Sequence, residues 1–200
     1  MIPRPRKKPE KPAIPPIEPL SPLALNWLLT MLVLAVAPHA RELPAWLIGL
    51  FVLLAGWRWF LAVRDKSLPP RWLLLILVIL AGGAVLIDYR TLLGREAGVA
   101  LLTAMAACKL LESRVLRDGV VLVFLGYLMV MSHLLYSQEI PMVAYLLVVT
   151  VVLLAAQMMI HRQHAGLTAL APLRLASRML LLEIPAMLVL FVLFPRIPGP

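Results

Sequence analysis

The sequence predicts an all-α membrane protein: a polytopic bundle of about seven transmembrane helices, with the N-terminus inside the cell and the C-terminus outside. Of 200 residues, 62% are hydrophobic and 14% are charged, and the mean hydropathy is +0.93. A soluble domain with this composition would lack a polar surface. The hydrophobic residues form long runs, and the basic residues gather between alternate runs. The net charge of +9 therefore indicates membrane topology, and we expect no nucleic acid partner.

Residues 1–19 differ in composition from the rest of the chain. The first 22 residues contain eight prolines and five basic residues. Because proline interrupts helices and the segment has little to bury, we expect a disordered cytoplasmic tail. We expect its basic side chains to lie near anionic lipid headgroups. Alternatively, its prolines form a motif that a partner domain binds. One multi-helix transmembrane domain is expected over residues 20–200.

Seven hydrophobic runs follow the tail, at residues 20–37, 44–62, 72–87, 96–111, 119–136, 140–160 and 179–194. A helix needs about 20 residues to cross the bilayer, so the short third and fourth runs predict tilted or re-entrant helices. Losing both would leave five crossings and keep the C-terminus on the same side. Before the last run, Pro172 predicts an interfacial helix over 173–178, and Pro185 predicts a bend within the run itself.

The distribution of basic residues sets the orientation. With the N-terminus inside, the inner segments carry 15 of the 19 Lys and Arg residues. The outer segments carry the other four: Arg41, Arg90, Arg95 and Arg196. Since inner loops of membrane proteins are enriched in Lys and Arg, this division predicts an N-in, C-out membrane protein.

The fourth run, within the stretch 94–119, is expected to be a central packing helix. Ala97, Ala100, Ala104 and Ala107 recur three or four positions apart along it, and Gly94 and Gly98 form a small-residue pair at its start. Such a face allows another helix to approach closely in lipid.

A charged turn follows this helix and contains Lys109, Glu112, Arg114, Arg117 and Asp118. Lys109 and Glu112 are three residues apart, and Arg114 and Asp118 are four apart. These spacings predict two ion pairs that lower the cost of charge at a membrane boundary. A functional role for the cluster is the alternative.

Polar residues at the outer side are Arg95, Glu96, Gln138 and Glu139. They could form a rim that receives an extracytoplasmic domain or a substrate, although solvated loop ends are the favoured interpretation. Glu183 lies within the last run, where a carboxylate must be neutral or paired. An interhelical ion pair, with Lys109 as a candidate partner, is favoured over a proton or ligand site.

The remaining candidates give weak signals. His161 and His164 have a metal-ligand spacing without a third ligand, and His133 is expected to form a hydrogen bond within the bundle. Cys108 has apolar neighbours, which argues against a nucleophile. No protease, hydrolase, nucleotide or dinucleotide motif occurs in the sequence. We therefore expect no catalytic, cofactor or metal site in these 200 residues.

Two stretches carry a family resemblance. At GREAGVALLTAMAACKLLESRVLRDGVVLVFLGYLMV and LYSQEIPMVAY, the chain resembles the membrane-spanning N-terminal domain of TgpA-type bacterial transglutaminase-like proteins, a domain of unknown function. The final LFVLFPRIPGP is similar to the segment by which that domain leaves its last helix. The resemblance is strong over 94–140 and 190–200, looser over 44–93, and absent from the tail.

The resemblance implies an anchor and scaffold role in the bacterial inner membrane. Such proteins place a papain-like transglutaminase core with a Cys-His-Asp triad in the periplasm after the first bundle. Here that core would follow residue 200, so no triad residue can be assigned and Cys108 does not correspond to the catalytic cysteine. The expected partners are the lipid bilayer and the protein's own periplasmic domain. A small transporter or channel-like domain, using Glu183 and the outer polar residues, is the alternative from another functional class.

Overall fold

The computed structural model describes residues 19–91, 94–136, 139–162 and 170–193. This part of the chain is almost entirely helical, and an isolated bridge joins Pro19 to Val115. The elements in order are α1 (Pro22–Val36), the 3-10 helix η1 (Ala37–Arg41), α2 (Ala45–Val63), α3 (Arg71–Tyr89), α4 (Arg95–Glu112), α5 (Leu116–His133), α6 (Ile140–His161) and α7 (Ala171–Leu193).

Local sequence explains where several helices begin and end. Pro22 opens α1, where a missing N–H costs nothing, and the Ser21 side chain accepts the N–H of Ala24 at 3.2 Å. After α3, Arg90 adopts a left-handed φ of 54°. Gly94 then precedes α4 with a φ of 143°, a conformation that favours glycine. These two residues turn the chain from α3 into α4.

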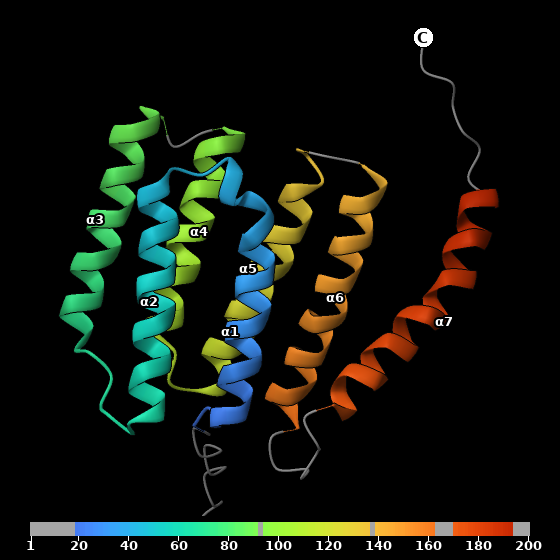
Figure 1. The fold of residues 1–200 in the computed structure, drawn as a ribbon, viewed down its shortest axis with the longest axis horizontal. Coiled ribbons are helices and arrows are strands. Elements are labelled where there is room, and N and C mark those ends of the chain that lie inside the picture. Colours follow the sequence, from blue (N-terminus) through green and yellow to red (C-terminus); the bar gives the residue numbers. More distant parts are fainter. Residues whose placement is uncertain (1–18, 92–93, 137–138, 163–169, 194–200) are drawn as a thin grey trace, which may run out of the picture.

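Successive helices run antiparallel (Figure 1). The starts of α1, α3, α5 and α7 and the ends of α2, α4 and α6 share one end of the bundle, here called the basic end. The 3-10 helix, the starts of α2, α4 and α6 and the ends of α3 and α5 share the opposite end, here called the η1 end. Helix α7 ends on the η1 side and packs mainly on α6, apart from the other helices. The described chain therefore starts and finishes at opposite ends of the bundle.

Helix α4 lies in the middle of the bundle and packs against α2, α3 and α5. Ala100 and Ala104 are buried, at 0% and 3% exposure. Gly94 and Gly98 are exposed, and a Cβ added at either would meet nothing within 4 Å. The expected close approach of another helix at these two glycines is therefore wrong within the described residues. The alanines beyond them line the interior.

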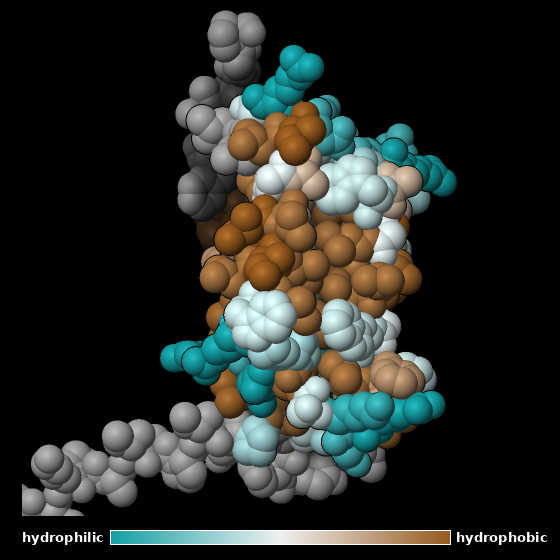
Figure 2. All heavy atoms as spheres, turned by 90° about the vertical axis from the view of Figure 1, so that its left-hand side faces the viewer, coloured by the Kyte–Doolittle hydropathy of each residue, from teal (hydrophilic) through white to brown (hydrophobic). Residues whose placement is uncertain are grey.

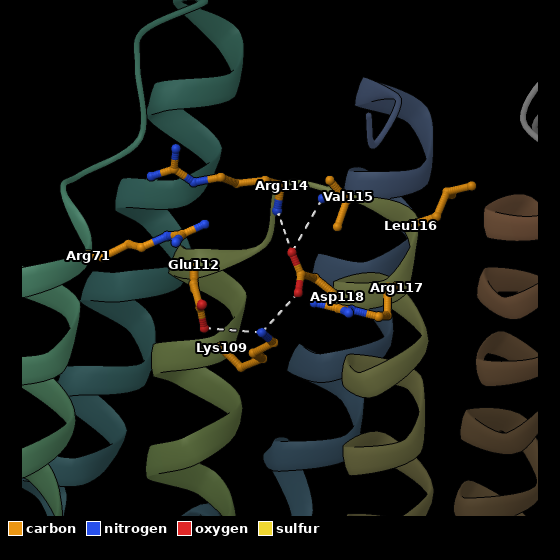
Figure 3. Close-up of a pocket in the computed structure, with 8 residues that line it drawn as sticks. All are labelled: Arg71, Lys109, Glu112, Arg114, Val115, Leu116, Arg117 and Asp118. Atoms are coloured by element: carbon orange, nitrogen blue, oxygen red, sulfur yellow. Dashed lines mark hydrogen bonds and ion pairs between the residues drawn. The ribbon is translucent and has the colours of Figure 1, made fainter. Parts of the chain in front are cut away.

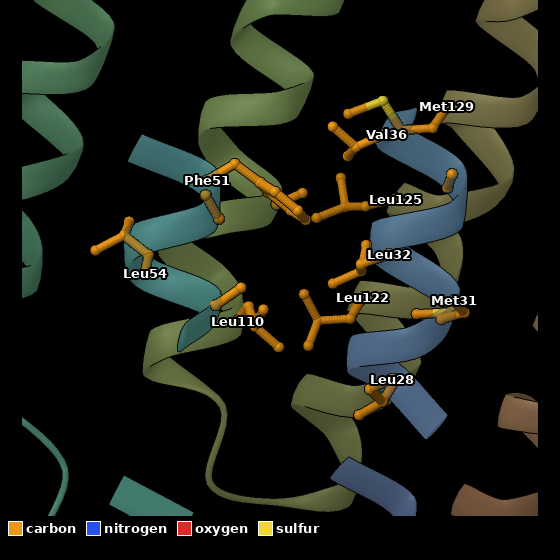
Figure 4. Close-up of a cluster of buried hydrophobic side chains, with 14 of the residues drawn as sticks. Leu28, Met31, Leu32, Val36, Phe51, Leu54, Leu110, Leu122, Leu125 and Met129 are labelled. Carbon is orange, nitrogen blue, oxygen red and sulfur yellow. The ribbon is translucent and has the colours of Figure 1, made fainter. Parts of the chain in front are cut away.

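The hydrophobic core joins the middle helices to α1 (Figure 4). Buried leucine, methionine, valine and phenylalanine side chains meet between the helices, among them Leu28, Met31, Leu32, Val36, Phe51, Leu54, Leu110, Leu122, Leu125 and Met129. At Gly126 of α5 the next helix comes closest, because an added Cβ would lie 2.6 Å from Cδ2 of Leu153 on α6. Close van der Waals packing of these side chains holds the helices together.

Five helical segments of the described chain are long and apolar enough to cross a membrane: α1 with η1, α2, α3, α5 and α6. Figure 2 shows the face toward α3, with a broad hydrophobic band between hydrophilic residues gathered near the two ends. Helix α4 carries two charged residues near each end, and its 18 residues would rise about 27 Å.

Three expected boundaries need correction. Helix α3 has 19 residues and is not short, because Arg71 and Tyr89 extend it beyond the apolar run at both ends. Helix α5 begins at Leu116, since Asp118 caps a turn that hydropathy alone places outside the helix. The interfacial segment 173–178 and the last run form one continuous helix, α7, which runs through Pro185.

Candidate functional site

The charged turn at the basic end is built around Lys109 and Asp118 (Figure 3). Nζ of Lys109 lies 3.1 Å from Oε2 of Glu112 and 2.9 Å from Oδ1 of Asp118. Oδ2 of Asp118 accepts the backbone N–H groups of Arg114, at 3.0 Å, and Val115, at 3.3 Å. The Asp118 side chain is only 13% exposed. One carboxylate therefore pairs with the lysine and caps the first turn of α5.

The predicted ion pair of Lys109 with Glu112 is present. Arg114 and Asp118 do interact, but not through the predicted ion pair between their side chains. Asp118 binds the backbone of Arg114, whereas the guanidinium of Arg114 donates from Nη2 to the carbonyl oxygen of Pro69 at 2.9 Å. Buried Arg58 reaches the same turn from α2 and donates from Nη2 to the carbonyl oxygen of Ser113 at 3.0 Å. Two arginines thus hold the α4–α5 turn through backbone carbonyls.

A cavity of about 450 Å³ opens at this turn. Its walls come from the start of α3, the last turn of α4 and the first turn of α5, and the lining residues are Arg71, Lys109, Glu112, Arg114, Val115, Leu116, Arg117 and Asp118. Four of these residues are cationic and two are acidic. The turn thus combines an open cavity with excess positive charge.

At the η1 end, Arg95 stacks on Tyr136 and ties α4 to the chain after α5. Its guanidinium carbon lies 4.1 Å from the ring centroid, and Nη1 donates to the carbonyl oxygen of Leu135 at 3.1 Å. Burial and the Glu42 carboxylate raise the pKa of the Tyr136 phenol, while Arg95 acts in the opposite direction. Glu96 is exposed in the first turn of α4. Glu139 is exposed at the N-cap of α6. Gln138, the fourth predicted rim residue, lies outside the described residues.

A buried histidine pair lies under this rim. The rings of His39 and His133 are T-shaped with centroids 4.8 Å apart, and both side chains are almost fully buried. Nε2 of His39 is 3.2 Å from Oγ of Ser132. The expected hydrogen bond of His133 is absent, because neither of its ring nitrogens has a partner within the described chain. Sequence reasoning missed His39, since a single histidine at the end of an apolar run has no distinctive spacing.

Glu183 does not pair with Lys109, contrary to expectation. Lys109 is engaged by Glu112 and Asp118, and the Glu183 side chain is exposed on α7. The expected ion pair is wrong because Glu183 lies on α7, which packs mainly on α6, whereas Lys109 lies on α4. Cys108 is buried at 4% exposure.

No group of three or more His, Cys, Asp or Glu side chains suitable for a metal ion occurs in the described ranges. His161 is the last residue of α6, and His164 lies outside those ranges. The described polar residues therefore stabilise helix ends and turns. At the basic end, the arginines that line the cavity also make no ion pair within the described chain.

The profile of the TgpA N-terminal domain matches residues 27–200, which include the central helix, the charged turn and the histidine pair. The chain belongs to the TgpA N-terminal domain family. It is 36% identical over 177 residues to a protein-glutamine gamma-glutamyltransferase from Pseudomonas aeruginosa. The alignment covers 88% of this chain and 26% of that protein, so the chain spans about a quarter of the length of this curated relative. No solved structure matches the chain.

The match confirms the resemblance carried by the stretch around α4 and extends it to nearly the whole chain after the tail. TgpA N-terminal domain membership, together with five helices suited to a membrane, identifies the chain as the N-terminal part of a transglutaminase-like protein. The relative's name describes an activity of a much longer protein.

Proposed function

We propose that this TgpA N-terminal domain anchors a transglutaminase-like protein in the bacterial inner membrane and delivers the following chain to the periplasmic side. The proposed bundle crosses the membrane seven times, with the basic end toward the cytoplasm. The parent protein would transfer or hydrolyse the γ-acyl group of glutamine side chains through a cysteine thioester. None of its catalytic residues is assigned to the present 200 residues.

The observation that carries this proposal is the placement of the two ends of the described chain. The described chain forms seven successive antiparallel helices. The first of them starts at the basic end, and the last finishes at the η1 end. Of all Lys and Arg residues, 15 of 19 fall in the segments assigned to the starting side, which the positive-inside rule makes cytoplasmic. An odd number of crossings then suits a catalytic core that works outside the cytoplasm.

The competing transporter function has little support. It requires Glu183 to face a pathway through the bundle together with the polar residues of the η1 end. Glu183 is exposed on a helix that packs mainly on α6. The buried polar groups of the η1 end, chiefly His39 and His133, belong to other helices.

The reading frame beyond codon 200 tests the anchor function. We expect it to continue into a domain with Cys, His and Asp in a papain-like order. The full-length protein should then incorporate a primary amine into a glutamine-containing protein, and alanine at that cysteine should abolish incorporation. A stop codon directly after Pro200, with no neighbouring transglutaminase gene, would contradict the proposal.

A further inference from the structure

The cavity at the charged turn has excess positive charge that the described part of the chain does not neutralise. Its two acids, Glu112 and Asp118, both bind Lys109, and Asp118 also accepts two backbone N–H groups. Within the described chain, no carboxylate lies at ion-pair distance from the guanidinium groups of Arg71, Arg114 or Arg117. The cavity therefore has a surplus of two positive charges and retains several N–H donors.

The surrounding structure holds part of this charge in place. Arg114 is fixed by its bond to the Pro69 carbonyl, which leaves its other N–H groups available. Buried Arg58 lies close enough for its charge to repel that of Arg114, and it adds positive potential behind the cavity wall. Since arginine binds planar or tetrahedral oxyanions through two N–H groups, the arrangement suits a phosphate group.

The apolar surroundings favour a phosphate that is carried by a lipid. Val115 and Leu116 contribute apolar lining to the cavity itself. One helical turn deeper on the Arg71 side, a separate hollow of about 160 Å³ has entirely apolar walls, formed by Trp57, Leu73, Leu74, Ile76, Leu77, Leu80 and Leu111. Leu74 is three residues from Arg71 and so lies on the same side of α3. A headgroup at the arginines would thus place its acyl chain over an apolar groove.

We propose that the cavity at the basic end binds the phosphate group of an anionic phospholipid, with Arg71, Arg114 and Arg117 as its cationic contacts. Lys109 pairs with both acids of the turn, so these acids do not neutralise the arginines. The volume of about 450 Å³ falls in the range of small-molecule sites, which spans roughly 300–1,000 Å³. Basic pockets between transmembrane helices are known to hold lipid headgroups at the cytoplasmic side.

The test compares two variants of the full-length protein that lose the same charge at the same end. The cavity variant is Arg71→Gln with Arg117→Gln. The control variant is Arg64→Gln with Arg174→Gln, at two arginines that do not line the cavity. Bound lipid is measured by native mass spectrometry after titration with phosphatidylglycerol, cardiolipin or phosphatidylcholine. Arg71 and Arg117 are exposed at helix starts, and single substitutions provide a second set if the double variant does not fold.

We expect wild-type protein and the control variant to retain phosphatidylglycerol or cardiolipin over phosphatidylcholine. The cavity variant should bind these anionic lipids roughly tenfold more weakly, since each basic residue contributes to headgroup attraction. Inorganic phosphate tests the soluble source. Suppose that phosphate raises the melting temperature of the wild-type protein but not of the cavity variant, and that the wild-type protein binds all three lipids equally. The phosphate site would then stand, and the proposal that a lipid occupies it would be overturned. Equal binding by both variants, or no preference for anionic lipid or phosphate, would overturn the site itself.

Discussion

Replacing Asp118 with alanine should lower the free energy of unfolding by about 3 kcal/mol, because one carboxylate serves three partners. The substitution removes the 2.9 Å ion pair with Lys109 and the acceptor for the N–H groups of Arg114 and Val115. The α4–α5 turn, on which both helices depend, would lose its cap. Unfolding in detergent micelles, followed by circular dichroism during titration with sodium dodecyl sulfate, measures the change.

Two further variants separate the charge of Asp118 from its capping role. Asp118→Asn keeps an oxygen acceptor for the backbone but loses the charge, so it should be intermediate in stability. Arg117→Ala changes an exposed neighbour in the same turn and should alter stability by less than about 0.5 kcal/mol. If Asp118→Ala were no less stable than Arg117→Ala, the carboxylate would not hold the turn.

Gly126→Val should be the most damaging glycine substitution described here, with a loss of about 2 kcal/mol from overpacking. A Cβ at Gly126 would lie 2.6 Å from Cδ2 of Leu153 and 3.6 Å from Sδ of Met31. Valine adds two methyl groups beyond that Cβ, so α5 and α6 must separate. The same detergent unfolding assay measures the loss.

The matched control is Gly82→Val in the outer helix α3, where an added Cβ meets nothing within 4 Å. This control should change stability little. Leu153→Ala should partly rescue Gly126→Val, since it removes the methyl group that the new side chain strikes. Their combined loss should therefore be smaller than the sum of the single losses. Equal effects of valine at Gly82 and Gly126 would show that the close approach of α5 and α6 does not limit packing.

The all-α class was predictable because long apolar runs without strand-like alternation indicate apolar helices. All seven predicted runs coincide with helices of the structure. The predicted helix boundaries are wrong at polar helix ends, because hydropathy does not identify polar residues that belong to a helix. Asp118 caps α5, which begins at Leu116, three residues before the predicted apolar run. The basic residues of α7 belong to the same helix as its apolar half.

The polar sites were only partly predictable, because sequence spacing reports neighbours on one helix and not contacts between elements. The Lys109–Glu112 pair followed from its spacing of three, whereas the stronger geometry of Lys109 with Asp118 depends on the fold of the turn. The pairing of His39 with His133 joins residues 94 positions apart, and no pattern in the sequence connects them. Gly98 fits a packing motif but lies open.

The most direct test of the proposed topology places an alkaline phosphatase reporter, active only outside the cytoplasm, at three positions. The proposal predicts activity after Arg90, none after Arg117 and activity after Pro200. The first two positions flank α4, so their difference tests whether the central helix crosses the membrane. The reverse pattern would overturn the orientation, and equal activity after Arg90 and Arg117 would show that α4 does not cross.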